Sequence, residues 1–586
     1  MAAAIHRNRN ERPFIIVRTL VPQKETAEPK PSVLAGVTFY HWLVVLIASC
    51  GWLFDCMDQR LFTVSKESAL KELLGNDAAA QAALSTYLNY AVAAMMVGWG
   101  AGGLLFGMLS DKWGRVKTMV ATLLVYSGFT GLSGLAHTWF EFTCYRFLVG
   151  LGVGGMFGAA TTLVAESVPG GFRAVALGAL QALSATGNMT GTLISLKIQP
   201  GAEGIPFFDW LPVGHSGWRL LFFVGILPAL LVVPIVFLLK EPEKWRAAKA
   251  AAAAGKGPGK IGSPLELLRH PRWRKNTLVG LGLGVAGMVG LWGIGFFSPE
   301  LVTSALRNTP VQVTDLKAPA ALVTALRDAP TPAAAHIQGR LSPTVASQLA
   351  AIRDPNTLPA GFPPILVDEL NRLTQGASLY DAGAFQAVTL KKNTANLLAQ
   401  VAHSPRPGDL VFLNRQLLEQ ALPGTLAPIQ NYIDGVRSRG LLLQDVGSLL
   451  GMIAFTFVAS RLSRRAAFFG AFVLCLATTA YVFTSLKTET DAYWMLPMMG
   501  FAQLAVFAGY SIYFPELYPT RLRGTGVGFC YNVVRFLTVP FNLLMGLLSA
   551  WLSFRTAAVI LSSIYVLGLV ALIWAPETKG QPLPED

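Results

Sequence analysis

Long apolar stretches recur along the whole chain, and short polar loops separate most of them. A helix needs about 20 mostly apolar residues to cross the hydrocarbon layer of a membrane, which is roughly 30 Å thick. Twelve stretches come close to this length, and we predict a spanning helix in each. Their approximate bounds are 40–64, 84–110, 116–137, 141–166, 173–197, 218–239, 276–298, 440–460, 466–486, 491–514, 525–551 and 554–575.

The composition agrees with this pattern. Of the 586 residues, 53% are hydrophobic and only 14% are charged, whereas soluble domains usually carry about a quarter charged residues. Glycine, with 57 residues, is abundant, as expected where helices pack closely in lipid. The net charge of +14 does not indicate nucleic-acid binding, because the basic residues lie in short loops between apolar stretches.

The positions of the basic loops predict the orientation of the chain. Lys and Arg are dense in segments 1–38 and 240–275, and smaller basic groups follow other apolar stretches. All of them fall on one side if both termini are cytoplasmic, as the positive-inside rule requires. The resulting division is a cytoplasmic N-terminal tail (1–38), an N-terminal six-helix half (39–239), a basic cytoplasmic linker (240–275), helix 7 (276–298), an extracytoplasmic insert (299–438), helices 8–12 (439–575) and a cytoplasmic C-terminal tail (576–586).

The insert at 299–438 contains no stretch long and apolar enough to span. Leu and Val recur in it at helical spacing, which favours a small, mostly helical folded domain. The alternative is a partly disordered loop.

Several classes of site are not expected. The tail 1–38 has no apolar core, so no cleavable signal peptide is predicted. All cysteines lie in or beside predicted spans, and no Cys/His cluster suggests a metal or other cofactor. No nucleotide-binding loop and no catalytic Ser/His/Asp or Cys/His constellation is present, so the chain is not expected to be an enzyme.

Two segments 350 residues apart resemble each other. The first is "AESVPGGFRAVALG" (165–178) and the second is "PELYPTRLRGTGVG" (515–528). Both follow one predicted span and lead into the next, which indicates duplicated halves with the substrate site at their interface. We therefore predict an all-α membrane protein of twelve transmembrane helices in two six-helix pseudo-symmetric halves. The matched pairs are Glu166/Glu516, Pro169/Pro519, Arg173/Arg523 and Gly178/Gly528.

The loop "GMLSDKWGRVK" (107–117) resembles the signature of the major facilitator superfamily. The corresponding loop of the second half, "VASRLSRRA", has Ser460 in place of the acid. The acidic and basic residues at these helix ends are expected to form ion pairs that latch a cytoplasmic gate in one state. The predicted gate comprises Gly107, Asp111, Gly114, Arg115, Glu166, Arg173, Glu516 and Arg523.

Three further segments are similar to the proton-coupled sugar porters of that superfamily. They are "YRFLVGLGVGG" (145–155), "WRLLFFVGILPALL" (218–231) and the "PETKGQPL" tail (576–583). The stretch 282–300 lacks the glutamines of those porters. The resemblance thus leaves both a sugar and an organic acid open as the solute.

Ionisable residues inside spans usually face a cavity or a partner. In the sugar porters an acid of helix 1 lies near an arginine of helix 4, and by resemblance these are Asp55 and Arg146. Such a carboxylate can carry the coupled proton; the alternative is a permanent structural ion pair. Asp58, three residues further on, can be the carrier instead.

Polar residues of two other helices are candidates for substrate binding. Gln181 and Asn188 lie two turns apart on one helical face, where the sugar porters bind sugar; interhelical hydrogen bonding is the alternative. Asn532 and Arg535 can face the same cavity. A buried arginine would suit a carboxylate-bearing solute.

These features predict a secondary active transporter of a small polar solute, a sugar or an organic acid. It is expected to work as a monomer in the cytoplasmic (inner) membrane by alternating access, with protons as coupling ions and no nucleic-acid partner. An uncoupled facilitator and a nutrient receptor on a transporter scaffold are the alternatives.

Overall fold

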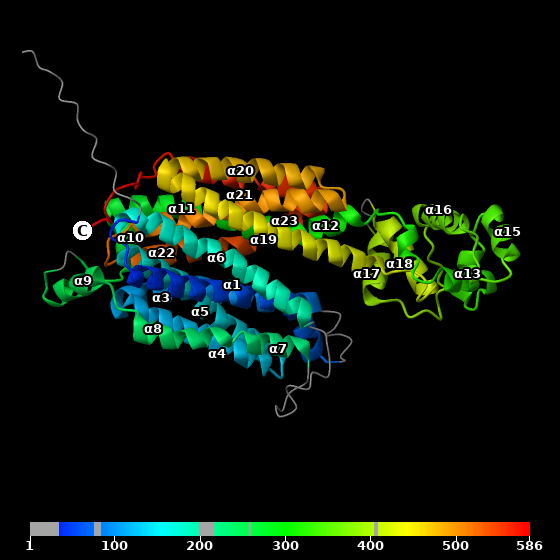
Figure 1. Ribbon diagram of the computed structural model, residues 1–586, viewed down its shortest axis with the longest axis horizontal. Helices are drawn as coiled ribbons and strands as arrows, with labels where there is room; N and C mark the ends of the chain where they lie inside the picture. The colour runs from blue at the N-terminus through cyan, green and yellow to red at the C-terminus, as the bar shows by residue number, and fades with distance from the viewer. Residues whose placement is uncertain (1–33, 76–83, 199–215, 257–258, 404–407, 586) are drawn as a thin grey trace, which may run out of the picture.

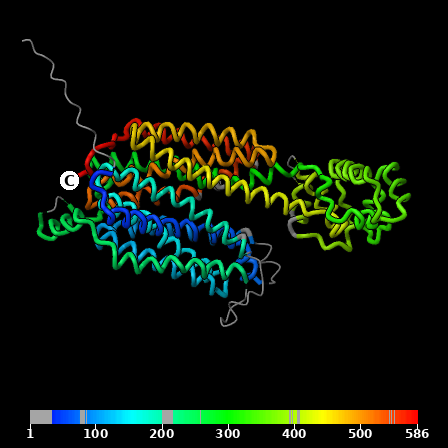
Figure 2. The backbone as a smooth tube through the Cα atoms, viewed as in Figure 1, coloured from blue at the N-terminus to red at the C-terminus, as the bar shows by residue number. Residues whose placement is uncertain are grey.

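The computed structural model describes residues 34–75, 84–198, 216–256, 259–403 and 408–585 (Figure 1). Regular structure in these residues is helical, with one isolated bridge between Leu316 and Leu426. Long helices form a bundle, and a group of shorter helices stands at one end of it (Figures 1 and 2). Most of the predicted tail 1–38 lies outside the described residues.

The six N-terminal apolar stretches all fall on helices. Helix α1 continues well beyond the predicted end at residue 64, because the polar sequence after it still favours a helix. The stretch 218–239 is divided into three short pieces, and Pro228 lies in the first turn of the middle one. The bounds are α1 Phe39–Leu73, α3 Leu84–Trp113, α4 Arg115–Gly134, α5 Trp139–Ser167, α6 Gly170–Lys197, α7 Gly217–Val224, η2 Leu227–Leu231 and α8 Val232–Leu238.

The remaining apolar stretches are helical as well. Helix α19 begins 11 residues before the predicted span at 440, so it crosses the predicted boundary between insert and bundle without a break. The stretch 525–551 contains a 3-10 segment, η5, in its middle. The bounds are α11 Pro271–Gly293, α19 Ile429–Arg461, α20 Arg464–Ser485, α21 Glu489–Glu516, α22 Arg523–Asn532, η5 Val533–Leu537, α23 Thr538–Trp551, α24 Phe554–Leu561 and α25 Ile564–Ala571.

The predicted linker and insert also contain helices. Leucines of the insert pack with apolar residues of α19, α20 and α21 in one continuous cluster, so the insert shares its core with the bundle. The linker helices are α9 Glu243–Ala253 and α10 Pro264–Arg269. The others are η3 Gly295–Phe297, α12 Ser298–Leu306, η4 Val313–Asp315, α13 Pro319–Asp328, α14 Pro332–Gln338, α15 Pro343–Ala351, α16 Phe362–Gln375, α17 Lys392–His403 and α18 Asp409–Ala421.

Nine helical stretches of the described residues are long and apolar enough to cross a membrane. Helices α4 and α6 and the α22–α23 stretch are not among them. Helix α6 carries many Ser, Thr, Asn and Gln residues, and α22 and η5 contain arginines. Large apolar side chains such as Leu230, Phe237 and Phe457 are mostly exposed on the bundle, as expected of a surface that faces lipid.

Glycines set the closest helix contacts. A Cβ at Gly98 or Gly102 of α3 would lie 2.1 or 2.0 Å from a carbonyl oxygen of α5. A Cβ at Gly447 or Gly451 of α19 would lie 2.0 Å from a carbonyl oxygen of α21. Both helix pairs therefore pack backbone to backbone through glycines four residues apart, a common arrangement in membranes. The bundle ends near α9, α10 and the C-terminal residues, opposite α13–α16 (Figure 1).

Candidate functional site

A buried ion cluster joins the beginning of α4 to the end of α5. Arg115 donates from Nε and Nη2 to the two carboxylate oxygens of Glu166, each over 3.0 Å. Arg523, at the start of α22, donates from Nη1 to the same carboxylate. All three side chains are buried. Because a buried charge is tolerated only when it is paired, Glu166 ties together helices that are far apart in the sequence.

Asp111, in the last turn of α3, faces the N-terminus of α22. Its carboxylate accepts hydrogen bonds from the amides of Gly524 (2.9 Å) and Thr525 (2.8 Å) and from the Thr525 hydroxyl (2.7 Å). The first amides of a helix have no intrahelical partner, and the helix dipole favours an anion there. Asp111 therefore caps a helix that begins more than 400 residues later in the chain.

Two glycines of the predicted gate have clear structural roles. A Cβ at Gly107 would lie 2.7 Å from the carbonyl oxygen of Gly524, so α3 and α22 meet here without a side chain between them. Gly114 has a φ of 123°, which residues with a Cβ rarely adopt. It precedes α4, whose first two amides donate to the carboxylate of Glu241 over 2.7 and 3.0 Å.

A second ion cluster lies at the start of α20. Arg464 donates from Nε and Nη2 to Glu516 over 3.2 and 3.0 Å, and Thr578 Oγ1 donates to the same carboxylate over 2.5 Å. Glu577 accepts from the first two amides of α20 over 3.1 and 3.3 Å. Burial alone would raise the pKa of Glu577, but the Ser463 hydroxyl and neighbouring amides, which bond the charged form, hold it below its usual value.

Two residues at this end of the bundle behave differently from their counterparts in the other half. The Nε of Arg173 donates to the carbonyl oxygen of Ala165 over 3.0 Å, and the charge of Glu516 acts on Arg173 only at longer range. Ser460 is half-buried on α19, where its hydroxyl donates to the carbonyl oxygen of Phe457. Ion pairs among the residues expected to form the gate therefore lie around Glu166 and Glu516, and Arg173 forms none with the described part of the chain.

Arg146 lies beside Asp58, with Nη1 4.0 Å from Oδ2 and both side chains fully buried. Its Nε and Nη2 donate to the Ser133 hydroxyl over 3.1 and 2.6 Å. The guanidinium also lies 4.7 Å from the ring centre of Phe222. The resemblance suggested Asp55 as the partner of Arg146, but Asp58 holds this position. Three residues along a helix turn a side chain by about 300°, which is about 60° short of a full turn, so the two acids lie on the same side of α1 but have different neighbours.

Asp55 is also fully buried, and its surroundings differ. Its Oδ2 accepts a hydrogen bond from Gln59 over 3.0 Å, and its Oδ1 has no hydrogen-bond partner among the described residues. The charges that act on it are those of Asp58 and of Arg535 in η5. Asp55 therefore lies within electrostatic range of an arginine that comes from the other end of the sequence.

Arg535 is buried where the helix of 523–551 is interrupted. Its guanidinium lies 3.4 Å from the ring centre of Trp99 and 5.4 Å from that of Tyr531. Within the described part of the chain, Nε and Nη1 of Arg535 donate no hydrogen bond. A 3-10 segment in the middle of a helix often marks a functional hinge. The arrangement leaves a buried cation with donor capacity and flat aromatic neighbours.

Asn532 and Gln181 are both buried and both occupied by helix contacts. Asn532 donates from Nδ2 to the carbonyl oxygen of Gly154 over 3.1 Å and fits against Gly103. Gln181 accepts from Trp52 Nε1 over 3.1 Å. These contacts are the interhelical hydrogen bonds that the sequence allowed as an alternative for Gln181. Asn188, two turns further along α6, is half-buried.

A cavity of about 30 Å³ lies beside Trp99. It has space for roughly one water molecule. Residues of α1, α3 and α11 line it, and they are Gln59, Phe62, Thr63, Lys66, Val92, Met95, Met96, Trp99 and Trp292. Trp99 therefore separates this cavity from the guanidinium of Arg535.

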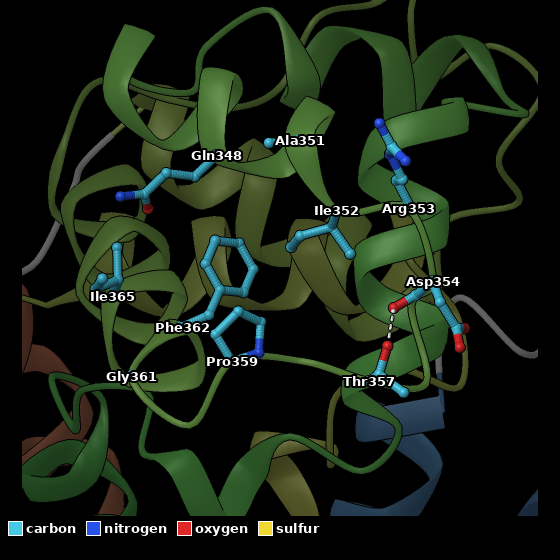
Figure 3. A pocket seen from close by; sticks show the side chains of 10 residues that line it. All are labelled: Gln348, Ala351, Ile352, Arg353, Asp354, Thr357, Pro359, Gly361, Phe362 and Ile365. Atoms are coloured by element: carbon cyan, nitrogen blue, oxygen red, sulfur yellow. Dashed lines mark hydrogen bonds between the residues drawn. The ribbon is translucent and has the colours of Figure 1, made fainter.

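A larger cavity of about 600 Å³ lies in the insert. Figure 3 shows Phe362, Ile352 and Ile365 along it, with the Thr357 hydroxyl bonded to the backbone of Asp354. Its lining comes from α15, α16 and the segment between them. No charged residue of the bundle lines it, so it is separate from the buried ion clusters.

Sequence reasoning missed several residues of this site. Trp99 is a single tryptophan in a glycine-rich stretch, and its position there was the only sequence signal that it could have a role. Tyr531, whose ring stacks on Phe157 with centroids 3.7 Å apart, resembled any aromatic core residue. Glu241 lies in the linker, which the sequence showed only as charged, and Glu577 lies in the "PETKGQPL" tail, for which the sequence predicted no contact. Among the described residues, no group of three or more His, Cys, Asp or Glu side chains is placed to hold a metal.

A family model described as "Major Facilitator Superfamily" matches residues 48–346, and the chain belongs to this superfamily. The solved structure of the proton:xylose symporter XylE is similar in fold, with a TM-score of 0.54 and 15% identity, covering 93% of this chain and 98% of that one. The protein thus has the all-helical fold of this family of membrane transporters, which are not enzymes.

Two curated relatives are transporters of small molecules. The cis,cis-muconate transport protein of Acinetobacter baylyi (strain ATCC 33305 / BD413 / ADP1) is 31% identical over 213 residues, which cover 36% of this chain and 48% of that protein. The niacin transporter NiaP of the same strain is 29% identical over 204 residues, 35% of this chain and 41% of its own length. The matched regions thus span about half or less of these relatives.

Proposed function

We propose that the protein carries a small carboxylate-bearing solute across the cytoplasmic membrane by alternating access, together with protons. The observation that carries the proposal is Arg535, a buried arginine with two nitrogens that bond to nothing described in the protein. A buried cation with unused donors is costly. A carboxylate bound to its planar fork would satisfy both the charge and the donors.

The surroundings of Arg535 favour a flat solute. Trp99 lies against the guanidinium, and Tyr531 and Trp292 lie within 6 Å of it by ring centre. Aromatic side chains bind planar, unsaturated bodies through offset stacking and edge contacts. Cis,cis-muconate and niacin, the solutes named for two relatives, are planar carboxylates, which supports an organic acid over a sugar.

Asp55 supplies a mechanism for proton coupling. A deprotonated Asp55 attracts Arg535, and protonation removes that attraction. The guanidinium is then free to bind the carboxylate of the solute, so proton and anion enter together. Asp58 is paired with Arg146 inside the first helices, and it is the alternative carrier.

The number of membrane crossings and the orientation of the chain are part of the same proposal. The chain is taken to cross the cytoplasmic membrane twelve times as a monomer, in two related halves with both termini inside and residues 299–438 outside. A cysteine introduced at Ser342 should then react with an impermeant thiol reagent added to intact cells. One introduced at Gly255 should not. Reverse labelling would place the insert in the cytoplasm.

Uptake into proteoliposomes with an imposed pH gradient tests the function. Planar carboxylates should accumulate, and hexoses should not. Arg535→Gln should abolish uptake, and Arg535→Lys should retain part of it, because lysine keeps the charge but loses the planar fork. Accumulation of sugars by both wild type and Arg535→Gln would contradict the carboxylate proposal.

Asp55→Asn tests the coupling, because it removes the titratable proton and keeps the shape of the side chain. The variant should lose accumulation driven by the pH gradient and keep exchange of labelled for unlabelled solute. Asp58→Asn is the matched control. Loss of accumulation in Asp58→Asn alone would transfer the role to that residue. Accumulation that does not depend on pH in wild type would indicate an uncoupled facilitator, and binding without transport would indicate a receptor.

A further inference from the structure

An ion pair joins α1 to α19 inside the bundle. Arg60 Nη2 lies 2.7 Å from Asp445 Oδ2, and the two side chains are 19% and 10% exposed. The residues are 385 positions apart in the chain, and neither takes part in the ion clusters described above. Charges inside a membrane span are costly and usually have a functional role.

A second pair of opposite charges involves Lys66, six residues further along α1. Lys66 and Glu300 attract each other, and Glu300 lies in the first turn of α12. Helix α12 follows directly on the end of α11 and η3. The two pairs of opposite charges therefore relate α1 to α12, the first helix of the insert, and to α19, the helix that leads out of the insert.

Helix α19 makes the insert and Asp445 one rigid unit. Its first residues, including Ile433 and Val436, are buried in the apolar cluster that contains the leucines of the insert. Asp445 follows Val436 by nine residues in the same unbroken helix, a distance of roughly 14 Å. A movement of the insert would therefore be transmitted directly to the Arg60–Asp445 contact.

We infer that α12 and α19, with the insert, close over α1 as the outer gate of the transporter, held by the Arg60–Asp445 ion pair and assisted by Lys66 and Glu300. The cavity beside Trp99 is partly lined by Lys66, so opening these contacts would connect that cavity, and Arg535 behind it, to the outside. The inference rests on the proposed alternating access. It does not depend on the identity of the solute or on the proton carrier.

The gate can be tested without any solute. Met95 is buried and lines the cavity, so Met95→Cys reports its opening to an impermeant thiol reagent in a background with the exposed Cys144 changed to Ser. Asp445→Asn should speed labelling by about 5-fold or more, the lower end of typical coupling between sites. Adding Glu300→Gln should speed it further. The control Asp328→Asn, which breaks an exposed ion pair with Arg327 in the insert, should have no effect.

Exchange of the two charges separates a gate from a general loss of structure. Arg60→Asp and Asp445→Arg should each speed labelling, and the double exchange should restore the slow rate. Thermal unfolding measured beside it identifies a variant that has lost its fold. Unchanged labelling in Asp445→Asn, or a folded double exchange that labels as fast as the single variants, would overturn the inference. Labelling rates are measured without transport. A failure of the gate inference can therefore be distinguished from a failure of the proposed function, which the Arg535 and Asp55 variants test.

Discussion

The two loops that lead into α4 and α20 share two features and differ in a third. In both, an arginine at the start of the helix forms a bidentate ion pair with a glutamate: Arg115 pairs with Glu166, and Arg464 pairs with Glu516. In both, a second glutamate from a following segment caps the new helix. Only the first loop, through Asp111, also holds the N-terminus of a helix from the far end of the chain.

The difference separates structural contacts from those suited to switching. The arginine–glutamate pairs occur in both halves and join neighbouring helices, so their simplest role is to stabilise the packing of the bundle. Asp111 and Arg523 form contacts that their counterparts Ser460 and Arg173 do not form. The closure at this end of the bundle is therefore one-sided, and we expect α22 to be released from α3 and α5 when this end opens.

The largest effect should come from removing Glu166, because two buried arginines depend on it. Glu166→Gln should lower the free energy of unfolding by about 3–5 kcal/mol, the usual cost of leaving a buried charge unpaired. Glu516→Gln, whose carboxylate accepts from only one arginine and a threonine, should cost less. Tryptophan fluorescence during thermal unfolding in detergent measures both. An equal or greater loss in Glu516→Gln would contradict the asymmetry.

Asp111→Asn should mainly change the rate of transport. The variant keeps one acceptor but loses the charge that faces the dipole of α22, so we expect a roughly tenfold slower uptake, equal to about 1.4 kcal/mol. The KM should stay within a few fold, because Asp111 lies at a helix end, away from Arg535. Ser460→Ala is the matched control and should leave uptake unchanged. A large change in KM would place Asp111 in the binding site.

Much of the fold followed from the sequence because the hydrocarbon layer fixes helix length and polarity. The predicted stretches all fall on helices. The lengths of α1 and α19 did not follow, since hydropathy marks where lipid ends and a helix can continue beyond it. The break at η5 was not predicted either, although Pro540, three residues beyond it, is a signal for it, because a proline has no amide to donate to the carbonyl four residues back.

The ion clusters were only partly predictable. The spacing of the repeat identified Glu166, Glu516 and Arg523. Asp111 was identified because the loop 107–117 resembles the signature of the superfamily. Which acid faces Arg146 depends on how α1 is rotated, and the spacing of Asp55 and Asp58 alone could not decide it. The Arg60–Asp445 pair joins residues 385 positions apart, and no local pattern signals such a contact.

Arg523→Lys should slow transport less than Asp111→Asn does, but more than the matched variant Arg173→Lys. Arg523 bonds Glu166 and the Pro515 carbonyl at the same time, and a lysine cannot reproduce that geometry. Uptake should slow about three- to fivefold, equivalent to losing one ordinary hydrogen bond. Arg173→Lys should have little effect on the same uptake measurement. Equal slowing in both variants would show that Arg173 and Arg523 contribute equally to the closure.

The smallest effect concerns the glutamate caps, and it depends on pH. Glu577→Gln keeps an acceptor for the first amides of α20 but loses the charge, so at neutral pH it should cost about 0.3–1 kcal/mol. Solvent screening of this half-buried group favours the lower end. Because the pKa of Glu577 is below its usual value in the folded protein, its contribution is fully present above the usual glutamate pKa of about 4.3. That contribution is lost as the pH falls from there through the folded value. The melting temperatures of wild type and Glu577→Gln should therefore differ at pH 7 and converge in acid. A difference that stays constant down to pH values below the ordinary pKa would show that the variant acts through packing and not through charge.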